Sequence, residues 1–123
     1  MATTINVDAR AGDLVVVCPD QLGPALARLV DTNKLQVVRY PDLGDPRFVD
    51  WADYNERLAG VDVAAVADRI LATAGDHSIW LEWSDGYRIA GEQCADQANE
   101  LVIRRPGTRP VVDANSVLYF EFA

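Results

Sequence analysis

Histidine, cysteine and methionine are scarce in this chain of 123 residues, which contains one His, two Cys and one Met. So few imidazole and thiol groups cannot form a zinc cluster at the usual ligand spacing, and we expect no metal site. Long apolar runs are also missing. No stretch approaches the about 20 residues that cross a bilayer, so we expect no segment to insert into a membrane. The polar stretch from Met1 to Ala11 lacks the apolar core of a signal peptide.

Positive charge is limited as well: 11 Lys and Arg residues stand against 19 Asp and Glu residues, giving a net charge of -8. Such an acidic field repels phosphate groups, so we expect no binding to nucleic acid or to anionic membrane surfaces. The basic residues gather at Arg104, Arg105 and Arg109, with Arg88 before them. We expect them to be solvated residues at the C-terminus of a helix, where the helix dipole favours positive charge.

The chain has no glycine-rich phosphate loop. The first predicted strand is followed by the sequence CPDQLG at 18–23, not by a Gly-x-Gly-x-x-Gly turn. Pro19 removes an N–H group where a phosphate would need one, and Asp20 would repel the phosphate. We therefore expect no nucleotide and no other cofactor.

The residues that are present predict an α/β fold, and 50% of them are hydrophobic, enough for a core. Apolar and β-branched runs predict strands at 14–17, 35–40, 78–83, 111–112 and 117–122. Helical patterns cover 22–30, 51–58 (with Asp50 as its cap), 62–74 and a segment that carries Cys94 and ends near Pro106. This order predicts one domain over 1–123, a three-layer Rossmann-like sandwich. Its mostly parallel sheet has four to five strands and a C-terminal antiparallel hairpin linked at 115–116.

Two of the predicted helices have a clear apolar face. In the helix at 62–74, Asp62 is the expected N-cap and Gly75 the expected end, and the apolar residues between them repeat with helical spacing. In the helix at 22–30, the apolar face is expected to consist of Leu22, Leu26, Leu29 and Val30. Both faces should pack on the sheet.

Polar and aromatic residues follow the first and third strands, at the edge where open parallel sheets bind their ligands. The candidate binding residues there are Asp20, Gln21, Trp83, Ser84, Tyr87 and Arg88. Such a mixture lines a polar pocket with aromatic walls, which suits a sugar or another small polar ligand. In the alternative interpretation, Trp83 and Tyr87 only cover the end of the core and the sequence SDG at 84–86 is a plain turn.

We find no catalytic set. Cys18 and Ser84 are the only nucleophiles at the ends of the strands, and the single histidine, His77, precedes the third strand. His77 should thus lie at the opposite edge of the sheet, roughly 15–20 Å away for a strand of ordinary length. A general base must lie within hydrogen-bond reach of its nucleophile, so this domain is not expected to be an enzyme by itself.

The two cysteines should lie at the same edge of the sheet, since Cys18 follows the first strand at its carboxyl end and Cys94 lies in the first turn of the helix after the third strand. A disulfide is geometrically plausible in an oxidising compartment. Two small buried thiols in a cytosolic domain are an equally good interpretation of the residues alone.

Three segments resemble one known family: VVVCPDQLGP at 15–24, VDWADYNER at 49–57 and IWLEWSDGYR at 79–88. They are similar to the C-terminal soluble domains of actinobacterial multi-pass membrane proteins related to glycosyltransferases of the GT-C type. Cys94 also falls where the family pattern carries a cysteine. The resemblance covers roughly residues 11 to 105 and carries over no catalytic residue.

The resemblance implies a piece of a larger membrane protein that follows the last transmembrane helix and stays tethered to the plasma membrane outside the cytoplasm. Catalysis would then lie in membrane-proximal loops of the parent protein, and this domain would bind a cell-wall glycan or acceptor, or dock the membrane part. An oxidising location favours a Cys18–Cys94 disulfide. The alternatives are a stand-alone soluble α/β enzyme with a pocket at the carboxyl ends of the strands, and a purely structural protein-interaction domain.

Overall fold

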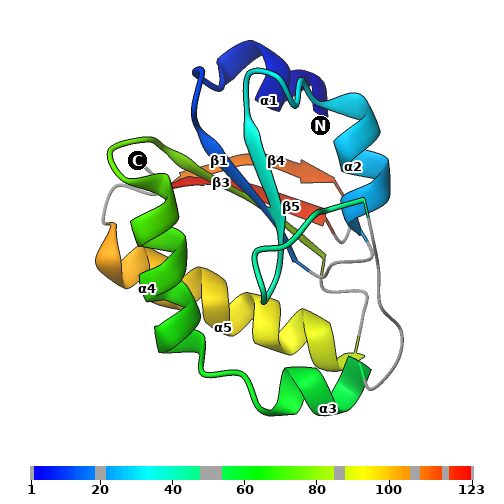
Figure 1. The fold of residues 1–123 in the computed structure, drawn as a ribbon, viewed down its shortest axis with the longest axis vertical. Helices are drawn as coiled ribbons and strands as arrows, with labels where there is room; N and C mark the ends of the chain where they lie inside the picture. Colours follow the sequence, from blue (N-terminus) through cyan, green and yellow to red (C-terminus); the bar gives the residue numbers. More distant parts are fainter. Residues whose placement is uncertain are drawn as a thin grey trace.

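The computed structural model describes residues 2–18, 22–47, 54–84, 88–105, 109–114 and 117–122 (Figure 1). The strands are β1 (Leu14–Cys18), β2 (Gln36–Arg39), β3 (Ile79–Ser84), β4 (Arg109–Ala114) and β5 (Val117–Phe122). The helices are α1 (Ala2–Asp8), α2 (Gly23–Leu29), α3 (Tyr54–Ala59), α4 (Val63–Ala74) and α5 (Arg88–Arg104). These elements confirm a mixed α/β fold.

The strands form one sheet in the order β2-β1-β3-β5-β4. β1 lies between β2 and β3 and is parallel to both, which confirms the predicted small parallel sheet. β5 runs antiparallel to β3, and β4 runs antiparallel to β5 at the outer edge. The register shifts between Pro110 and Val112. A proline is tolerated there because an edge strand or a bulge does not need its missing N–H.

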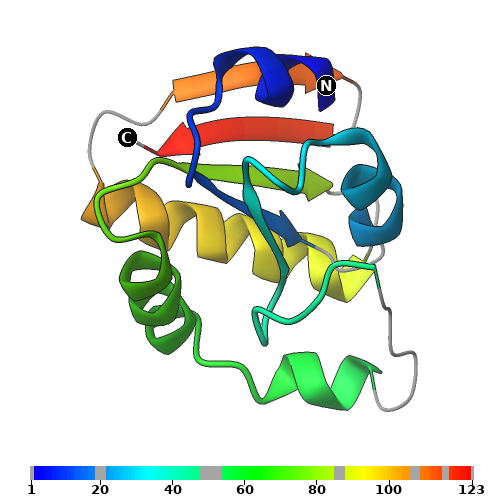
Figure 2. The same cartoon turned by 45° about the horizontal axis from the view of Figure 1, so that its top comes forward.

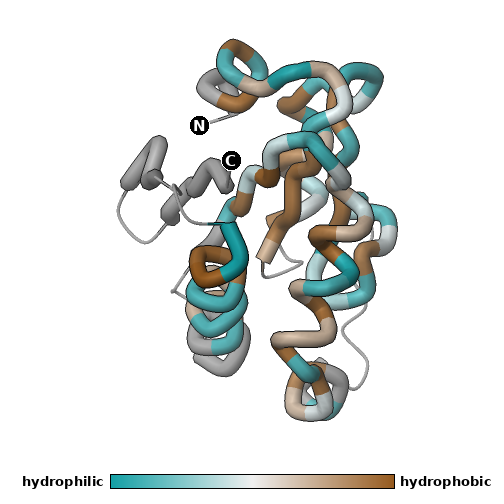
Figure 3. Tube along the Cα trace, turned by 90° about the vertical axis from the view of Figure 1, so that its left-hand side faces the viewer, coloured by the Kyte–Doolittle hydropathy of each residue, from teal (hydrophilic) through white to brown (hydrophobic). Residues whose placement is uncertain are grey.

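β1 is the central one of the three parallel strands. Its five residues are all apolar and all buried, as expected for a parallel strand covered on both faces. Alternate side chains enter different cores. Leu14, Val16 and Cys18 pack with α4 and α5, whereas Val15 and Val17 pack with α1 and α2. Helices therefore cover both faces of the parallel strands (Figure 2), and the apolar residues of these strands lie inside the molecule (Figure 3).

α4 is the helix that the sequence predicts best. The side chain of Asp62 accepts hydrogen bonds from the N–H groups of Ala64 and Ala65, so it is the N-cap. Gly75 ends the helix with a φ of 56°, a left-handed value that favours glycine. The buried face consists of Val66, Ala67, Ile70 and Ala74.

The apolar face predicted for α2 is wrong at Leu29, whose side chain is 64% exposed, while Leu26 and Val30 are buried. α2 ends at Leu29, and Val30 already has an extended backbone. Helical spacing therefore does not apply to Val30, and the four predicted residues do not form one helical face.

Other boundaries also differ from the prediction. α5 begins at Arg88, six residues before Cys94 in the chain, so Cys94 lies beyond the first turn of the helix. α3 begins at Tyr54, and its predicted start at 50–53 lies outside the described residues, as does the link at 115–116. α1 was not predicted. Ile5 of α1 and Ala9, which follows the helix, pack in the core that also contains Val15 and Val17. Two apolar residues are too short a pattern to recognise in the sequence.

Candidate functional site

The parallel strands end at one edge of the sheet, which we call the carboxyl edge. Cys18 ends β1 and is paired in register with Trp83, and Ser84 ends β3. Arg88 begins α5 shortly after that strand. The backbone thus brings three of the predicted binding residues to the carboxyl edge. Their side chains, and all of Asp20, Gln21 and Tyr87, lie outside the described residues, so the predicted pocket stays a prediction.

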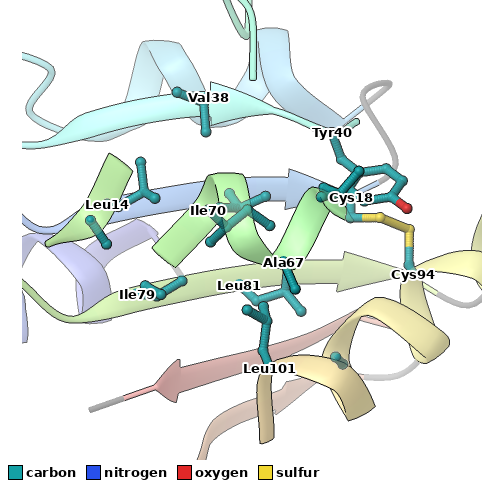
Figure 4. Close-up of a cluster of buried hydrophobic side chains, with 14 of the residues drawn as sticks. Leu14, Cys18, Val38, Tyr40, Ala67, Ile70, Ile79, Leu81, Cys94 and Leu101 are labelled. Carbon is teal, nitrogen blue, oxygen red and sulfur yellow. A yellow bond between two sulfur atoms is a disulfide. The ribbon is translucent and has the colours of Figure 1, made fainter. Parts of the chain in front are cut away.

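The centre of the carboxyl edge is a disulfide between Cys18 and Cys94, which confirms the predicted pairing. The two Cα atoms lie 5.7 Å apart, and the residues are separated by 76 positions in the chain. Both residues are fully or almost fully buried. The bond joins β1 to α5 directly (Figure 4), and it removes Cys18 as a free nucleophile.

Tyr40, which directly follows β2, packs beside the disulfide (Figure 4). Its side chain is 2% exposed. Burial raises the pKa of the Tyr40 hydroxyl above its usual value, and the charge of Asp96 adds to this. Among the described residues, this hydroxyl has no hydrogen-bond partner, and neither has the side-chain amide of Gln97 on α5. The carboxyl edge thus combines a covalent link with buried polar groups that the described chain does not satisfy.

Arg104 and Arg105, at the end of α5, are not only solvated as predicted but also bond to other elements. Arg104 forms ion pairs with Asp68 of α4 and with Glu100, and donates to the Ala64 carbonyl. The Arg105 guanidinium donates to the carbonyls of Gly75 and His77, both at 2.7 Å. The two arginines therefore attach the end of α5 to α4 and to the turn that follows α4. The side chains of Arg88 and Arg109 lie outside the described residues.

The opposite, amino edge of the sheet is organised by Asp13, which sequence reasoning missed. Its carboxylate is buried and accepts from the N–H groups of Arg10 and Ser78 and from the Trp80 indole, at 2.9, 3.1 and 3.2 Å. The only sequence signal is an acidic residue directly before a buried strand. Two of its three partners, Ser78 and Trp80, are 65 and 67 positions away in the chain, so the network could not be read from local spacing.

His77 also lies at the amino edge, as predicted. It lies two residues before β3 begins, and its Nδ1 is 4.0 Å from Asp13 Oδ1. The side chain is 54% exposed. Cys18 and Trp83 define the opposite end of the same strands, so the histidine and the cysteine are a strand length apart and do not form a catalytic pair.

A third feature lies at the outer side of β2. A groove of about 680 Å³ lies where α2, β2 and the segment that follows β2 meet. Its lining residues are Ala27, Thr32, Leu35, Gln36, Val37, Asp45, Pro46 and Arg47. We call it the β2 groove. No predicted binding residue is among the described residues that line it, because the prediction considered only the ends of strands and not their sides.

The described residues contain no group of three or more His, Cys, Asp or Glu side chains that could hold a metal ion. No helix within the described ranges is long and apolar enough to cross a bilayer.

In comparisons with known proteins, the chain matches no family model, no curated protein and no solved structure. The resemblance to membrane-protein domains of the GT-C type therefore stays a prediction from the sequence.

Proposed function

We propose that this chain is an extracytoplasmic accessory domain of a cell-envelope glycosyltransferase-like membrane protein, and that it is not catalytic by itself. The observation that carries the proposal is the buried disulfide between Cys18 and Cys94. Disulfides form and persist in oxidising environments outside the cytoplasm and are rare in the cytosol. Here the bond joins the central strand to the longest helix.

The accessory role rests on the chemistry of the carboxyl edge. Cys18 is bonded and His77 lies at the amino edge, so the nucleophile and base considered from the sequence do not act together. A glycan or acceptor would bind beyond the ends of β1 and β3, at Asp20, Gln21, Trp83, Ser84, Tyr87 and Arg88. What supports this site is the position of Trp83 beside Cys18 and the rule that open parallel sheets bind ligands there.

We also propose that the architecture is a three-layer, Rossmann-like sandwich, whose mostly parallel sheet of four to five strands ends in an antiparallel hairpin. The parallel order β2-β1-β3 supports this assignment, and so does the presence of one apolar core on each face of the central strand. In such a fold the carboxyl edge is open to ligands, because the helices cover the faces of the sheet.

Location can be tested with the natural full-length protein in its own cells. Free thiols are alkylated under denaturing conditions with a maleimide that carries a polyethylene glycol chain, before and after reduction. We expect Cys18 and Cys94 to react only after reduction. Reaction of both thiols without reduction would contradict an oxidising location.

Glycan binding needs a separate test, by isotope-labelled NMR of the chain with soluble cell-wall oligosaccharides. We expect shifts of the amide signals at Trp83, Ser84 and Arg88, and smaller shifts in the Tyr87→Ala variant. If no oligosaccharide shifts these signals while the disulfide is intact, the domain has a structural role and the glycan proposal fails.

A further inference from the structure

β2 is an edge strand, and its backbone shows which of its groups point away from the sheet. The N–H groups of Gln36 and Tyr40 donate inward, to the carbonyls of Asp13 and Val17, both at 3.0 Å. Arg39 instead bonds on the outer side, where its N–H donates to the Gly44 carbonyl and its carbonyl accepts from the Leu43 N–H. Because directions alternate along a strand, the N–H and carbonyl of Val37 also point outward.

The chain itself closes only the Arg39 end of this edge. The turn at 40–44 is fixed by Asp42, whose carboxylate accepts from the Arg39 guanidinium and from the Gly44 N–H. Nothing comparable covers Val37: within the described ranges no backbone group bonds to it on the outer side. An uncovered edge is a template for pairing with another extended chain.

The β2 groove lies against this uncovered position. It contacts the consecutive residues Leu35, Gln36 and Val37. Side chains of consecutive strand residues point to opposite faces, so a cavity that touches all three runs along the edge of the strand. Ala27 lies on the α2 side of the groove and Pro46 on the other side.

The segment around Pro46, which forms the side of the groove opposite β2, packs tightly against α2. The carbonyl of Pro46 lies so close to Gly23 that any side chain at Gly23 would collide with it. Figure 2 shows the segment after β2 returning towards α2. At the mouth, Asp45 pairs with Arg47 at 2.7 Å, and the hydrogen bond from Arg47 lowers the pKa of Asp45 to about 2, so the pair stays charged at neutral pH.

We propose that the β2 groove binds an extended peptide segment of a partner protein, which adds to the sheet as a strand beside β2. The peptide pairs its backbone with the N–H and carbonyl of Val37 and places one small apolar side chain between Ala27, Leu35 and Pro46. An extended backbone supplies a donor and an acceptor at one residue, which this edge requires. A sugar is a poorer occupant because none of the described residues that line the groove is aromatic, and the net charge of -8 disfavours a phosphate.

The test uses the isotope-labelled chain and the pentapeptide acetyl-KTVTK-amide, whose β-branched centre favours an extended backbone and whose basic ends complement the acidic chain. We expect concentration-dependent shifts centred on the amide signals of Ala27, Leu35, Val37 and Arg47. The same peptide N-methylated at its valine lacks one donor and should bind at least tenfold more weakly. Absent shifts, shifts centred elsewhere or equal binding of the methylated peptide would overturn the proposal.

Two variants and one control distinguish pairing at the edge of β2 from nonspecific binding of the peptide. Val37→Pro removes only the outward N–H, which an edge strand tolerates, and should lower the affinity at least tenfold. Val37→Ala keeps the N–H and is its matched control. Ala27→Phe fills the groove from α2 and should abolish binding even if Val37→Pro does not fold. Wild-type affinity in the folded Ala27→Phe variant would refute the proposed site.

Discussion

The two edges of the parallel sheet are held together by different chemistry. At the amino edge, one buried carboxylate, Asp13, satisfies donors from Arg10, Ser78 and Trp80. At the carboxyl edge, the Cys18–Cys94 disulfide joins β1 to α5, and nearby polar groups, such as the Tyr40 hydroxyl, have no partner among the described residues.

The difference shows how each edge is stabilised. A buried network whose polar groups are satisfied fixes one arrangement of its strands. At the carboxyl edge, where the Tyr40 hydroxyl has no partner among the described residues, the covalent link is the main described attachment between β1 and α5.

The largest effect should come from removing the disulfide. In a Cys18→Ala/Cys94→Ala variant, the unfolded chain regains the freedom that a link across 76 positions takes away. We expect the free energy of unfolding to fall by about 4 kcal/mol on the chain-entropy account. Urea denaturation measures this loss. Hydrogen exchange should show that the first half of α5 becomes less protected, while β1 keeps most of its protection. A loss below about 1 kcal/mol would mean that the carboxyl edge is held by packing alone.

The next largest effect is expected at the amino edge. Asp13→Ala leaves its backbone and indole donors buried without an acceptor, which should lower the free energy of unfolding by about 3 kcal/mol. His77→Ala is the control, since this exposed side chain lies 4.0 Å from the carboxylate and should change stability by less than about 0.5 kcal/mol. If Asp13→Ala costs more than loss of the disulfide, the ranking of the two edges is reversed.

The sequence predicted the parts of the fold that depend on local patterns. The uninterrupted apolar run of β1 predicted a strand buried on both faces, and Asp62 with Gly75 predicted both ends of α4, because capping is a property of neighbouring residues. The end of α2 at Leu29 could not be predicted, and Val30 was therefore placed on a helical face although its backbone is extended.

For the site, the residues alone left two interpretations of the cysteines open, and only the family resemblance favoured the disulfide that the structure contains. Asp13 and the β2 groove were missed for a common reason. Asp13 acts through Trp80, which is 67 positions away. The groove forms where α2, β2 and the segment around Pro46 meet. No local spacing encodes a contact of this kind.

A smaller effect is expected where α5 meets α4, at the end of the helix far from the disulfide. Arg105→Gln removes the charged donor to the carbonyls of Gly75 and His77. We expect a loss of about 1 kcal/mol in urea denaturation, since the group is partly exposed. Arg105→Lys keeps the charge but not the two-pronged geometry and should recover only part of this. An unchanged stability in Arg105→Gln would leave the disulfide as the main attachment of α5 and would sharpen the contrast between the edges.

The smallest effect at neutral pH is expected for Tyr40→Phe, and its direction is the informative part. The Tyr40 hydroxyl is buried without a partner among the described residues, so its removal should be neutral or should stabilise the protein by up to about 1 kcal/mol.

At alkaline pH the stabilities of the wild type and of the Tyr40→Phe variant should diverge. The pKa of Tyr40 is raised in the folded state by burial and by Asp96, so the stability linked to its proton is complete below the ordinary tyrosine pKa of 10.0. This stability is lost as the pH rises above that value, because the unfolded chain ionises first. Urea midpoints between pH 8 and pH 11, about the range that brackets this ionisation, should therefore fall less steeply for Tyr40→Phe than for the wild type. A destabilised Tyr40→Phe variant at neutral pH would mean that the hydroxyl has a partner, and that the carboxyl edge is as well satisfied as the amino edge.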